Sequence, residues 1–290
     1  MKKAIVLFII TLFFLPTNAE SLKVVEDEHL RILSWNIYML PGIANLSKQI
    51  EKNQKRQRAV EIGEMISASD YDIVVFQESF FAPARRKLKK ALKKAYPYMY
   101  GPINRGGFGL KTSSGIFIVS KIPLTELGTT QYRSCNGADC FAKKGAGLFE
   151  GEWNGKTFQI LGTHLNAGGP QWIREEQYKQ IADELLFPHQ KMGVPQIICG
   201  DMNTHREDSD GKYETMLSAL DCLDTPTYGE RQTTTVKDKG IIDYILYRPN
   251  ESSIQIIDKQ IRVFTTDTEV VDKLGGTLSD HLGVDLVVEL

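Results

Sequence analysis

The chain has 290 residues, of which 42% are hydrophobic and 24% are charged. This composition excludes collagen-like, coiled-coil and intrinsically disordered proteins. The 35 basic side chains nearly balance the 36 acidic ones, so the chain lacks the broad cationic surface of a protein held to nucleic acid by many phosphate contacts. The four cysteines are too few to build a disulfide-rich miniprotein.

The N-terminal segment differs from the rest of the chain. Lys2 and Lys3 precede an apolar and hydroxyl-bearing run over residues 4–15, and the small residue Ala19 follows. This pattern predicts a secretory signal peptide over residues 1–19, cleaved after Ala19, with a retained anchor as the alternative. Cleavage removes two lysines and no acidic residue, which leaves 33 basic against 36 acidic side chains and a net charge of −3. We expect the remaining chain to be secreted or periplasmic, with no transmembrane segment.

From about Leu30 onward, short apolar runs alternate with amphipathic stretches. The runs predict strands at 32–38, 72–77, 116–119, 147–153, 157–163, 195–199, 241–247, 254–263 and 282–288, with a hairpin turn at Asn154-Gly155. Helical spacing predicts helices at 57–67, 84–95, 172–186 and 213–220. Strands outnumber helices without strict alternation, which favours one α/β (α+β) domain over residues 20–290, built from two mixed β-sheets flanked by helices.

The helix expected over residues 84–95 is strongly basic. Its cations are Arg85, Arg86, Lys87, Lys89, Lys90, Lys93 and Lys94. A solvated outer face accounts for such a run, and docking to anionic lipid headgroups is the alternative.

Polar residues collect at five places at or beside the ends of predicted strands. The pieces are Trp35-Asn36, Gln77-Glu78, Thr163-His164, Asp201-Met202-Asn203 and Asp280-His281. Ends of neighbouring strands can converge on one rim of a sheet, where rigid backbone presents side chains to a cleft. We therefore expect these residues to form one site.

The residue types at these positions suit metal-assisted attack of water on a phosphodiester. The carboxylate of Glu78 and the carboxamide of Asn36 are oxygen ligands of the kind that Mg²⁺ prefers. The sequence contains no CxxC or HExxH pattern that would indicate zinc. Asp280, directly before His281, can fix the tautomer of an imidazole that deprotonates water.

The other strand-end residues suit recognition of a phosphoryl group. His164 and Asn203 can donate hydrogen bonds to the equatorial oxygens, where charge accumulates in the transition state. Asp201 can orient one of these donors or assist the leaving group.

The order of these motifs resembles that of the endonuclease/exonuclease/phosphatase superfamily, which includes DNase I-like nucleases, inositol-polyphosphate phosphatases and neutral sphingomyelinases. Two further segments are similar to secreted bacterial sphingomyelinases: residues 36–41 followed by Arg58-Ala59, and residues 135–145, with an aspartate and a lysine five residues apart. The resemblance implies a DNase I-like four-layered sandwich. It also implies a secreted, Mg²⁺-dependent sphingomyelin phosphodiesterase (sphingomyelinase C) that releases ceramide and phosphocholine.

The resemblance further implies a metal site and a base. Glu78 would be the principal Mg²⁺ ligand, with Asn36 beside the metal and the phosphate, and with Mn²⁺ or Co²⁺ as substitutes. His281 would activate the water, oriented by Asp280, and would also serve as a ligand if a second metal is present. Asp243 corresponds to an aspartate that supports a catalytic histidine.

The remaining roles implied by the resemblance concern the phosphate. His164, Asp201 and Asn203 would surround it. Asp139 would pair with Lys144, and Lys144 would reach the phosphate; a solvated basic pair with Lys143 is the alternative for that lysine.

The chain departs from the haemolytic members in one respect. Their aromatic-tipped hairpin before the final Ser-Asp-His corresponds here to residues 264–278, which contain charged and small residues and no Trp. Phe80 and Phe81, just after Glu78, are the alternative membrane anchors, with core packing as the simpler interpretation.

We expect a monomer that acts on sphingomyelin or a related choline phospholipid at a membrane surface and has no stable nucleic acid partner. A same-fold nuclease or phosphoinositide phosphatase, and a catalytically idle binding protein, are the alternative functions. The spacing of Cys135 and Cys140 in an exported chain predicts a local disulfide. Cys199 reads as a buried thiol, and its pairing with Cys222 is left open.

Overall fold

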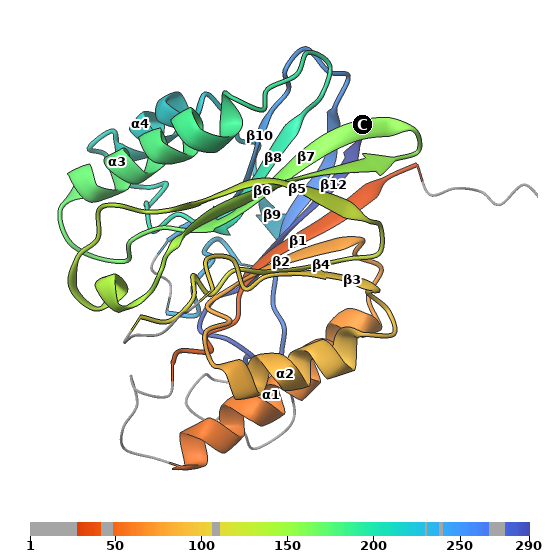
Figure 1. The fold of residues 1–290 in the computed structure, drawn as a ribbon, viewed down its shortest axis with the longest axis vertical. Helices are drawn as coiled ribbons and strands as arrows, with labels where there is room; N and C mark the ends of the chain where they lie inside the picture. The colour runs from red at the N-terminus through yellow and green to blue at the C-terminus, as the bar shows by residue number, and fades with distance from the viewer. Residues whose placement is uncertain (1–27, 42–48, 106–110, 230, 238–239, 267–275) are drawn as a thin grey trace, which may run out of the picture.

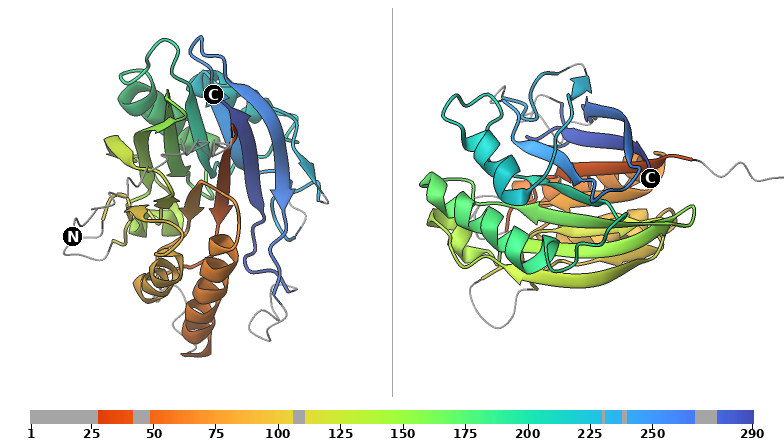
Figure 2. Two further views of the ribbon diagram at one scale, coloured as in Figure 1. Left: turned by 90° about the vertical axis from the view of Figure 1, so that its right-hand side faces the viewer. Right: turned by 90° about the horizontal axis from the view of Figure 1, so that it is seen from above.

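The computed structural model describes residues 28–41, 49–105, 111–229, 231–237, 240–266 and 276–290. The predicted signal peptide, residues 1–19, lies outside the described residues. Two β-sheets face each other in the middle of the molecule, and helices cover the outer face of each (Figures 1 and 2). The expected four-layered, DNase I-like arrangement is confirmed.

Both sheets are mixed. The larger sheet has the strand order β3 (Tyr98–Tyr100), β4 (Phe117–Ser120), β2 (Ile73–Gln77), β1 (Leu30–Asn36), β12 (Gly283–Glu289), β11 (Gln255–Arg262) and β9 (Tyr228–Gly229). The smaller sheet has the order β10 (Asp243–Arg248), β8 (Gln196–Asp201), β7 (Lys156–His164), β6 (Gly145–Trp153) and β5 (Leu124–Gln131). The parallel pairs are β1 with β2, β9 with β11, and β7 with β8; the other pairs are antiparallel.

The helices form the two outer layers. Helices α1 (Gln49–Ser67) and α2 (Ala82–Leu92) lie side by side against the larger sheet. Helix α3 (Gln171–Ile181), the π-helical turn η2 (Ala182–Leu186) and α4 (Lys212–Leu220) cover the smaller sheet (Figure 1). A short 3₁₀ helix, η1 (Gly137–Phe141), lies in the connection between β5 and β6.

Three apolar clusters fill the spaces between the four layers, and the pleat of the strands separates them. Ile197 points into the cluster between the two sheets, whereas its neighbour Ile198 points into the cluster beneath α3 and α4. In the larger sheet Ile32 and Leu33 divide in the same way, with Leu33 beneath α1 and α2. Successive side chains of a strand face opposite sides, so strands covered on both faces are apolar at nearly every position.

The structure also contains elements that the sequence patterns did not indicate. These are β3, β5, β9 and η1. The expected helix over 172–186 is α3 followed by the wider π turn η2, and the hairpin turn at Asn154-Gly155 joins β6 to β7 as predicted. Within the described part of the chain, no helix is both long enough and apolar enough to span a bilayer.

Candidate active site

The strand register brings the predicted strand-end residues to one edge of the two sheets. Asn36 pairs with Gln77 at the ends of the parallel strands β1 and β2. His164 pairs with Asp201 at the ends of the parallel strands β7 and β8, and Asp243 lies opposite Asp201 at the start of β10. The two sheets are then joined by a buried hydrogen bond, in which Asn36 Nδ2 donates to Asp201 Oδ2 at 3.0 Å.

Three residues at this edge hold the left-handed backbone conformation that non-glycine residues rarely adopt. The φ angles are 47° at Tyr38, 55° at Glu78 and 47° at Asn203. Such conformations cost free energy and persist where the surroundings fix them. Here the Tyr38 amide donates to Asn36 Oδ1 at 3.1 Å, and the Asn203 amide donates to Asp201 Oδ1 at 3.0 Å. The side chains of the site therefore also fix the turns that follow β1 and β8.

His281 is held by its backbone and by its ring. Trp35 Nε1 donates to the His281 carbonyl at 3.0 Å, and the His281 Nδ1 lies 2.9 Å from Asp243 Oδ2. The Asp280 carboxylate instead lies 3.5 Å from Ser279 Oγ. The carboxylate in contact with the ring is thus Asp243, the aspartate that the resemblance assigned to supporting a catalytic histidine. The residue pattern alone had suggested the adjacent Asp280.

The carboxylates of the site raise one another's pKa values. Burial raises the pKa of Glu78 to about 7, and the nearby charges of Asp280 and Asp201 add to this effect. Burial and the charge of Asp243 also raise the pKa of Asp201. Burial lowers the pKa of His281, but the charges of Asp243 and Asp201 outweigh it and hold that pKa well above its usual value. The cluster carries excess negative charge, which a cation would offset.

His164 lies between Asp201 and a buried lysine. Lys144 Nζ lies 2.8 Å from Asp139 Oδ1 and 3.1 Å from His164 Nε2, and it donates to the Leu165 carbonyl at 2.8 Å. These three acceptors occupy the three protons of the ammonium group. In this arrangement Lys144 supports His164, and a direct bond to a phosphate would require it to give up one partner. The expected pairing of Asp139 with Lys144 is present, and contact between Lys144 and a phosphate stays a prediction.

These contacts determine which ring nitrogen of His164 carries the proton. Burial and the charges of Lys144 and His281 hold the pKa of His164 well below its usual value, so the ring is neutral. Because the ammonium only donates, Nε2 accepts and Nδ1 carries the proton. His164 Nδ1 is buried and has no hydrogen-bond partner among the described residues. The ring can therefore offer one N–H to a bound group.

The donor atoms fit a hard divalent cation. One ligand atom each from Asp201, Asp243 and His281 lies within 4.8 Å of the other two. Glu78 Oε2 and Asp243 Oδ1 are buried oxygens for which the described residues provide no hydrogen-bond partner. Buried oxygens without partners are costly unless something else binds them, and oxygen-rich sites suit Mg²⁺. Asp201 and Asp243 are therefore candidate ligands in addition to Glu78, Asn36 and His281, the ligands expected from the sequence.

Two residues that support the site had no assigned role in the sequence analysis. The buried guanidinium of Arg58 donates to the carbonyls of Ile37, at 3.1 Å, and Leu278, at 2.6 Å. It thereby ties the end of β1 to the segment before His281. Thr234 Oγ1 accepts hydrogen bonds from the amides of Ile242 and Asp243. Arg58 lies in a segment that the resemblance singled out, whereas no sequence pattern marks Thr234.

Two of the four cysteines form the disulfide expected from the sequence, and the other two are free. Cys135 and Cys140 form a disulfide that closes the loop containing η1 and Asp139. Cys199 and Cys222 are both buried and free, which answers the question of their pairing.

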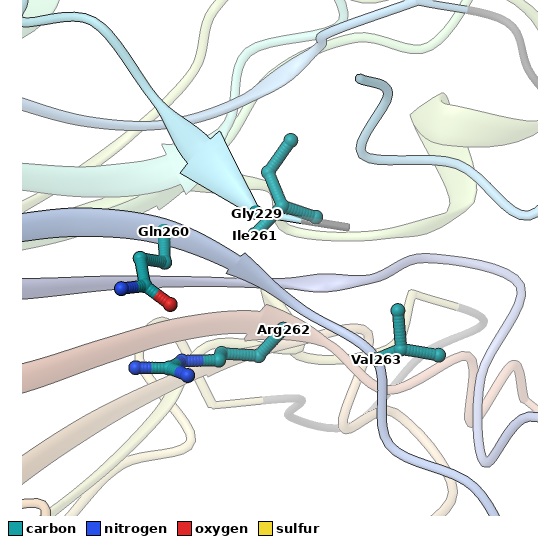
Figure 3. A pocket seen from close by; sticks show the side chains of 5 residues that line it. All are labelled: Gly229, Gln260, Ile261, Arg262 and Val263. Carbon is teal, nitrogen blue, oxygen red and sulfur yellow. The ribbon is translucent and has the colours of Figure 1, made fainter. Parts of the chain in front are cut away.

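Of two cavities in the described part of the chain, one lies away from the predicted site residues and the other is lined by two of them. The cavity in Figure 3, of about 420 Å³, is lined by Gly229 and residues 260–263 at the edge of the larger sheet, and includes none of the predicted site residues. A second cavity, of about 240 Å³, is lined by Asp139 and Lys144 together with Lys111, Arg133 and Asn166, among others. The second cavity therefore opens beside His164, next to the strand-end cluster.

Comparison with known proteins agrees with this geometry. A model of the Endonuclease/Exonuclease/phosphatase family matches residues 33–281. The chain is 29% identical to phospholipase C of Staphylococcus aureus over 249 residues, which cover 78% of this chain and 72% of the relative. It is 26% identical to sphingomyelinase C of Bacillus cereus over 247 residues, which cover 76% of this chain and 71% of the relative.

Solved structures share the fold. Two crystal structures of beta toxin from Staphylococcus aureus, each 24% identical in sequence, match with TM-scores of 0.76 and 0.72. Both matches cover 89% of this chain, and they cover 99% and 98% of the respective toxin chains. The second of these structures contains bound magnesium ions.

Proposed function

This chain belongs to the endonuclease/exonuclease/phosphatase family, and we propose that it is a secreted, Mg²⁺-dependent phosphodiesterase that hydrolyses sphingomyelin to ceramide and phosphocholine. The observation that carries the proposal is the cluster of Asp201, Asp243 and His281. The charges of Asp201 and His281 act on the pKa of Glu78, and the buried Oε2 of Glu78 has no hydrogen-bond partner among the described residues. The names of the relatives, a phospholipase C and a sphingomyelinase C, support the choice of substrate.

In the proposed mechanism, His281 is the base that removes a proton from the attacking water. Asp243 holds Nδ1 at 2.9 Å, which leaves Nε2 to accept that proton. Only a neutral ring accepts a proton, so the carboxylate charge that raises the pKa of His281 must be offset when the site is loaded. A bound Mg²⁺, held by Glu78 with Asn36 and the nearby aspartates, supplies that positive charge and stabilises charge on the phosphoryl oxygens.

The other side of the site binds the phosphate. His164 Nδ1–H and the side-chain carboxamide of Asn203 donate to the equatorial oxygens of the phosphoryl group, where negative charge develops. Lys144 and Asp139 position His164. Water attacks phosphorus in line with the leaving ceramide oxygen, and the proton of that water passes to His281. The bond from phosphorus to the ceramide oxygen breaks, and Asp201 assists its departure. The leaving oxygen takes up a proton from solvent water, and His281 returns its proton to the solvent.

We include in the proposal that residues 20–290 form a single catalytic domain that acts as a monomer, exported after removal of residues 1–19. Hydrolysis of a different phosphate ester, a phosphodiester in a nuclease or a phosphomonoester in a phosphoinositide phosphatase, would use the same catalytic residues. The substrate therefore has to be tested separately from the chemistry.

A substrate panel makes this test. The purified protein is assayed with Mg²⁺ on detergent-dispersed sphingomyelin and phosphatidylcholine, on a phosphoinositide, and on supercoiled plasmid DNA. We expect phosphocholine release, fastest from sphingomyelin, without nicking of the plasmid. Nicking without phosphocholine release, or release of inorganic phosphate from the phosphoinositide alone, would replace the proposal with the corresponding alternative.

A further inference from the structure

Two large aromatic side chains are exposed at the active-site end of the molecule. Phe141, the last residue of η1, is 63% exposed, and Trp172, the second residue of α3, is 53% exposed. Single exposed apolar residues are common on protein surfaces. Two aromatics on neighbouring loops beside a catalytic cluster are a different matter, because clustered exposed apolar surface marks an interaction site.

The loops that present these aromatics are bonded to each other. The Ala167 amide donates to Asp139 Oδ2 at 2.6 Å, and the Asn136 amide donates to Asn166 Oδ1 at 2.9 Å. The Cys135–Cys140 disulfide closes the first of the two loops. Through Lys144, Asp139 also connects this pair of loops to His164. The loop that ends at Phe141 and the segment that leads into α3 and Trp172 are thus joined to each other beside the proposed phosphate site.

Cations adjoin this rim. The Phe141 carbonyl accepts from the amide of Thr112, next to the exposed Lys111. Lys143 Nζ donates to the carbonyl of the exposed Arg105 at 3.2 Å. Neither Arg105, Lys111 nor Lys143 forms an ion pair with an acidic side chain of the described chain. Positive charge that is not neutralised by an acidic side chain of the described residues, beside exposed aromatics, is complementary to an interface with anionic headgroups.

The other candidate membrane anchors, Phe80, Phe81 and helix α2, do not combine exposed apolar side chains with exposed positive charge. Phe80 is only 9% exposed, and Phe81 packs partly buried against the cluster beneath α1 and α2, with the cation of Arg56 over its ring. The exposed lysines of α2 offer charge, but the apolar residues of that helix face the core. A single-stranded nucleic acid would also use aromatics and cations, but it needs a groove that follows its backbone. The nearest cavity is only about 240 Å³.

We propose that Phe141 and Trp172 insert into the interfacial layer of a phospholipid bilayer, with Arg105, Lys111 and Lys143 against anionic headgroups. The aromatic rim, defined as Phe141 and Trp172, presents the strand-end site to the membrane surface. The inference rests on the proposed function in that a lipid substrate lies in that surface. Vesicle binding itself requires no hydrolysis, so the two can fail separately.

The test measures sedimentation of the exported form, residues 20–290, with sphingomyelin–phosphatidylcholine vesicles, with and without phosphatidylserine, in EDTA. We expect Phe141→Ser with Trp172→Ser to weaken binding about tenfold or more, since each ring loses its buried area. The conservative pair Phe141→Trp with Trp172→Phe should retain binding. Phosphatidylserine should strengthen wild-type binding, and added salt should weaken it. Matched removal of the exposed Met192 and Ile257, as Met192→Ser with Ile257→Ser, should leave binding unchanged.

Fluorescence gives a second measurement that does not depend on a variant's fold. The other tryptophans, Trp35 and Trp153, are buried and partly buried, so vesicles should shift the emission of the exposed Trp172 to the blue in the wild type. Equal vesicle binding by the rim variant and the wild type, or no blue shift on binding, would overturn the inference. Binding of a single-stranded oligonucleotide that is lost in the rim variant, without vesicle binding, would assign the rim to nucleic acid instead. Vesicle binding without hydrolysis of any lipid would overturn only the proposed function.

Discussion

His281 has two acidic neighbours that differ in how they meet the imidazole. Asp243 contacts Nδ1, whereas the contact of Asp280 is with Ser279. We expect Asp243→Asn to lower kcat by about 10²-fold or more, because the amide no longer holds the ring in the tautomer that accepts a proton. Asp280→Asn should lower kcat much less. Steady-state kinetics on dispersed sphingomyelin compare the two variants, and an equal loss in both would contradict the assignment.

The same residues show what sequence could and could not reveal about the site. Strand ends located Asn36, Glu78, His164, Asp201 and His281, because apolar runs that stop at polar residues are visible in one dimension. The resemblance gave Asp243 the role of supporting a catalytic histidine, whereas the residue pattern alone suggested Asp280 as the partner of His281. The partner of His281 lies 38 positions away and is set by the register of β10 against β8.

The strands β5 and β6 pack closely at Gly145, beside the site, and leave no room there for a side chain. A Cβ at Gly145 would lie 1.9 Å from the backbone carbonyl of Thr130, on the partner strand. Gly145→Ala should therefore force the strands apart and cost about 1–3 kcal/mol of stability, with a fall in activity because Lys144 is adjacent. Urea unfolding monitored by circular dichroism measures the change.

The control for this substitution is Gly168→Ala, where a Cβ would meet nothing within 4 Å. It should change the free energy of unfolding by less than about 0.5 kcal/mol. Similar losses in the two variants would show that the close approach of β5 does not limit stability.

The elements that sequence patterns identified are those covered on both faces. β2 and β8 are buried at every position, and their apolar runs stand out. β5 was missed because it is the edge strand of the smaller sheet, with mostly exposed or partly exposed side chains and a polar sequence. β9 has only two residues, and β3 has three, which is too short for any alternation to show.

At the scale of the whole molecule, buried tyrosines make the free energy of unfolding fall at alkaline pH. Tyr96 is fully buried and donates to the Tyr71 carbonyl at 2.8 Å; burial raises its pKa to about 12, from an ordinary value of 10.0. Between these values the unfolded chain loses the proton and the folded chain keeps it. Stability therefore falls as pH rises through this window, by about 2–3 kcal/mol for this one group.

Tyr96→Phe should remove this part of the alkaline loss. At neutral pH the variant should be less stable than the wild type by about 1 kcal/mol, because the hydrogen bond to Tyr71 is gone. The difference should shrink or reverse as pH approaches 12. Urea unfolding at several alkaline pH values tests this, with Tyr228→Phe, at a 63% exposed position, as the control. A constant gap between variant and wild type across the range would contradict the account.

The layer order and the family of the molecule were accessible from sequence because both depend on motifs in order along the chain. The rim of Phe141 and Trp172 was not, because contacts between residues 135–143 and 165–171, which no sequence pattern shows, join the segments that carry these two residues. At this scale the central claim is that the strand-end cluster is a metal-dependent phosphodiesterase site.

The most direct test of that claim is the initial rate of phosphocholine release from dispersed sphingomyelin as Mg²⁺ is titrated. The account predicts no release in EDTA, recovery when Mg²⁺ is returned in excess, and a loss of at least about 10²-fold in Glu78→Gln. Glu175→Gln, at an exposed position on α3, should behave as the wild type. Release that persists in EDTA, or that is equal in Glu78→Gln and Glu175→Gln, would contradict the account.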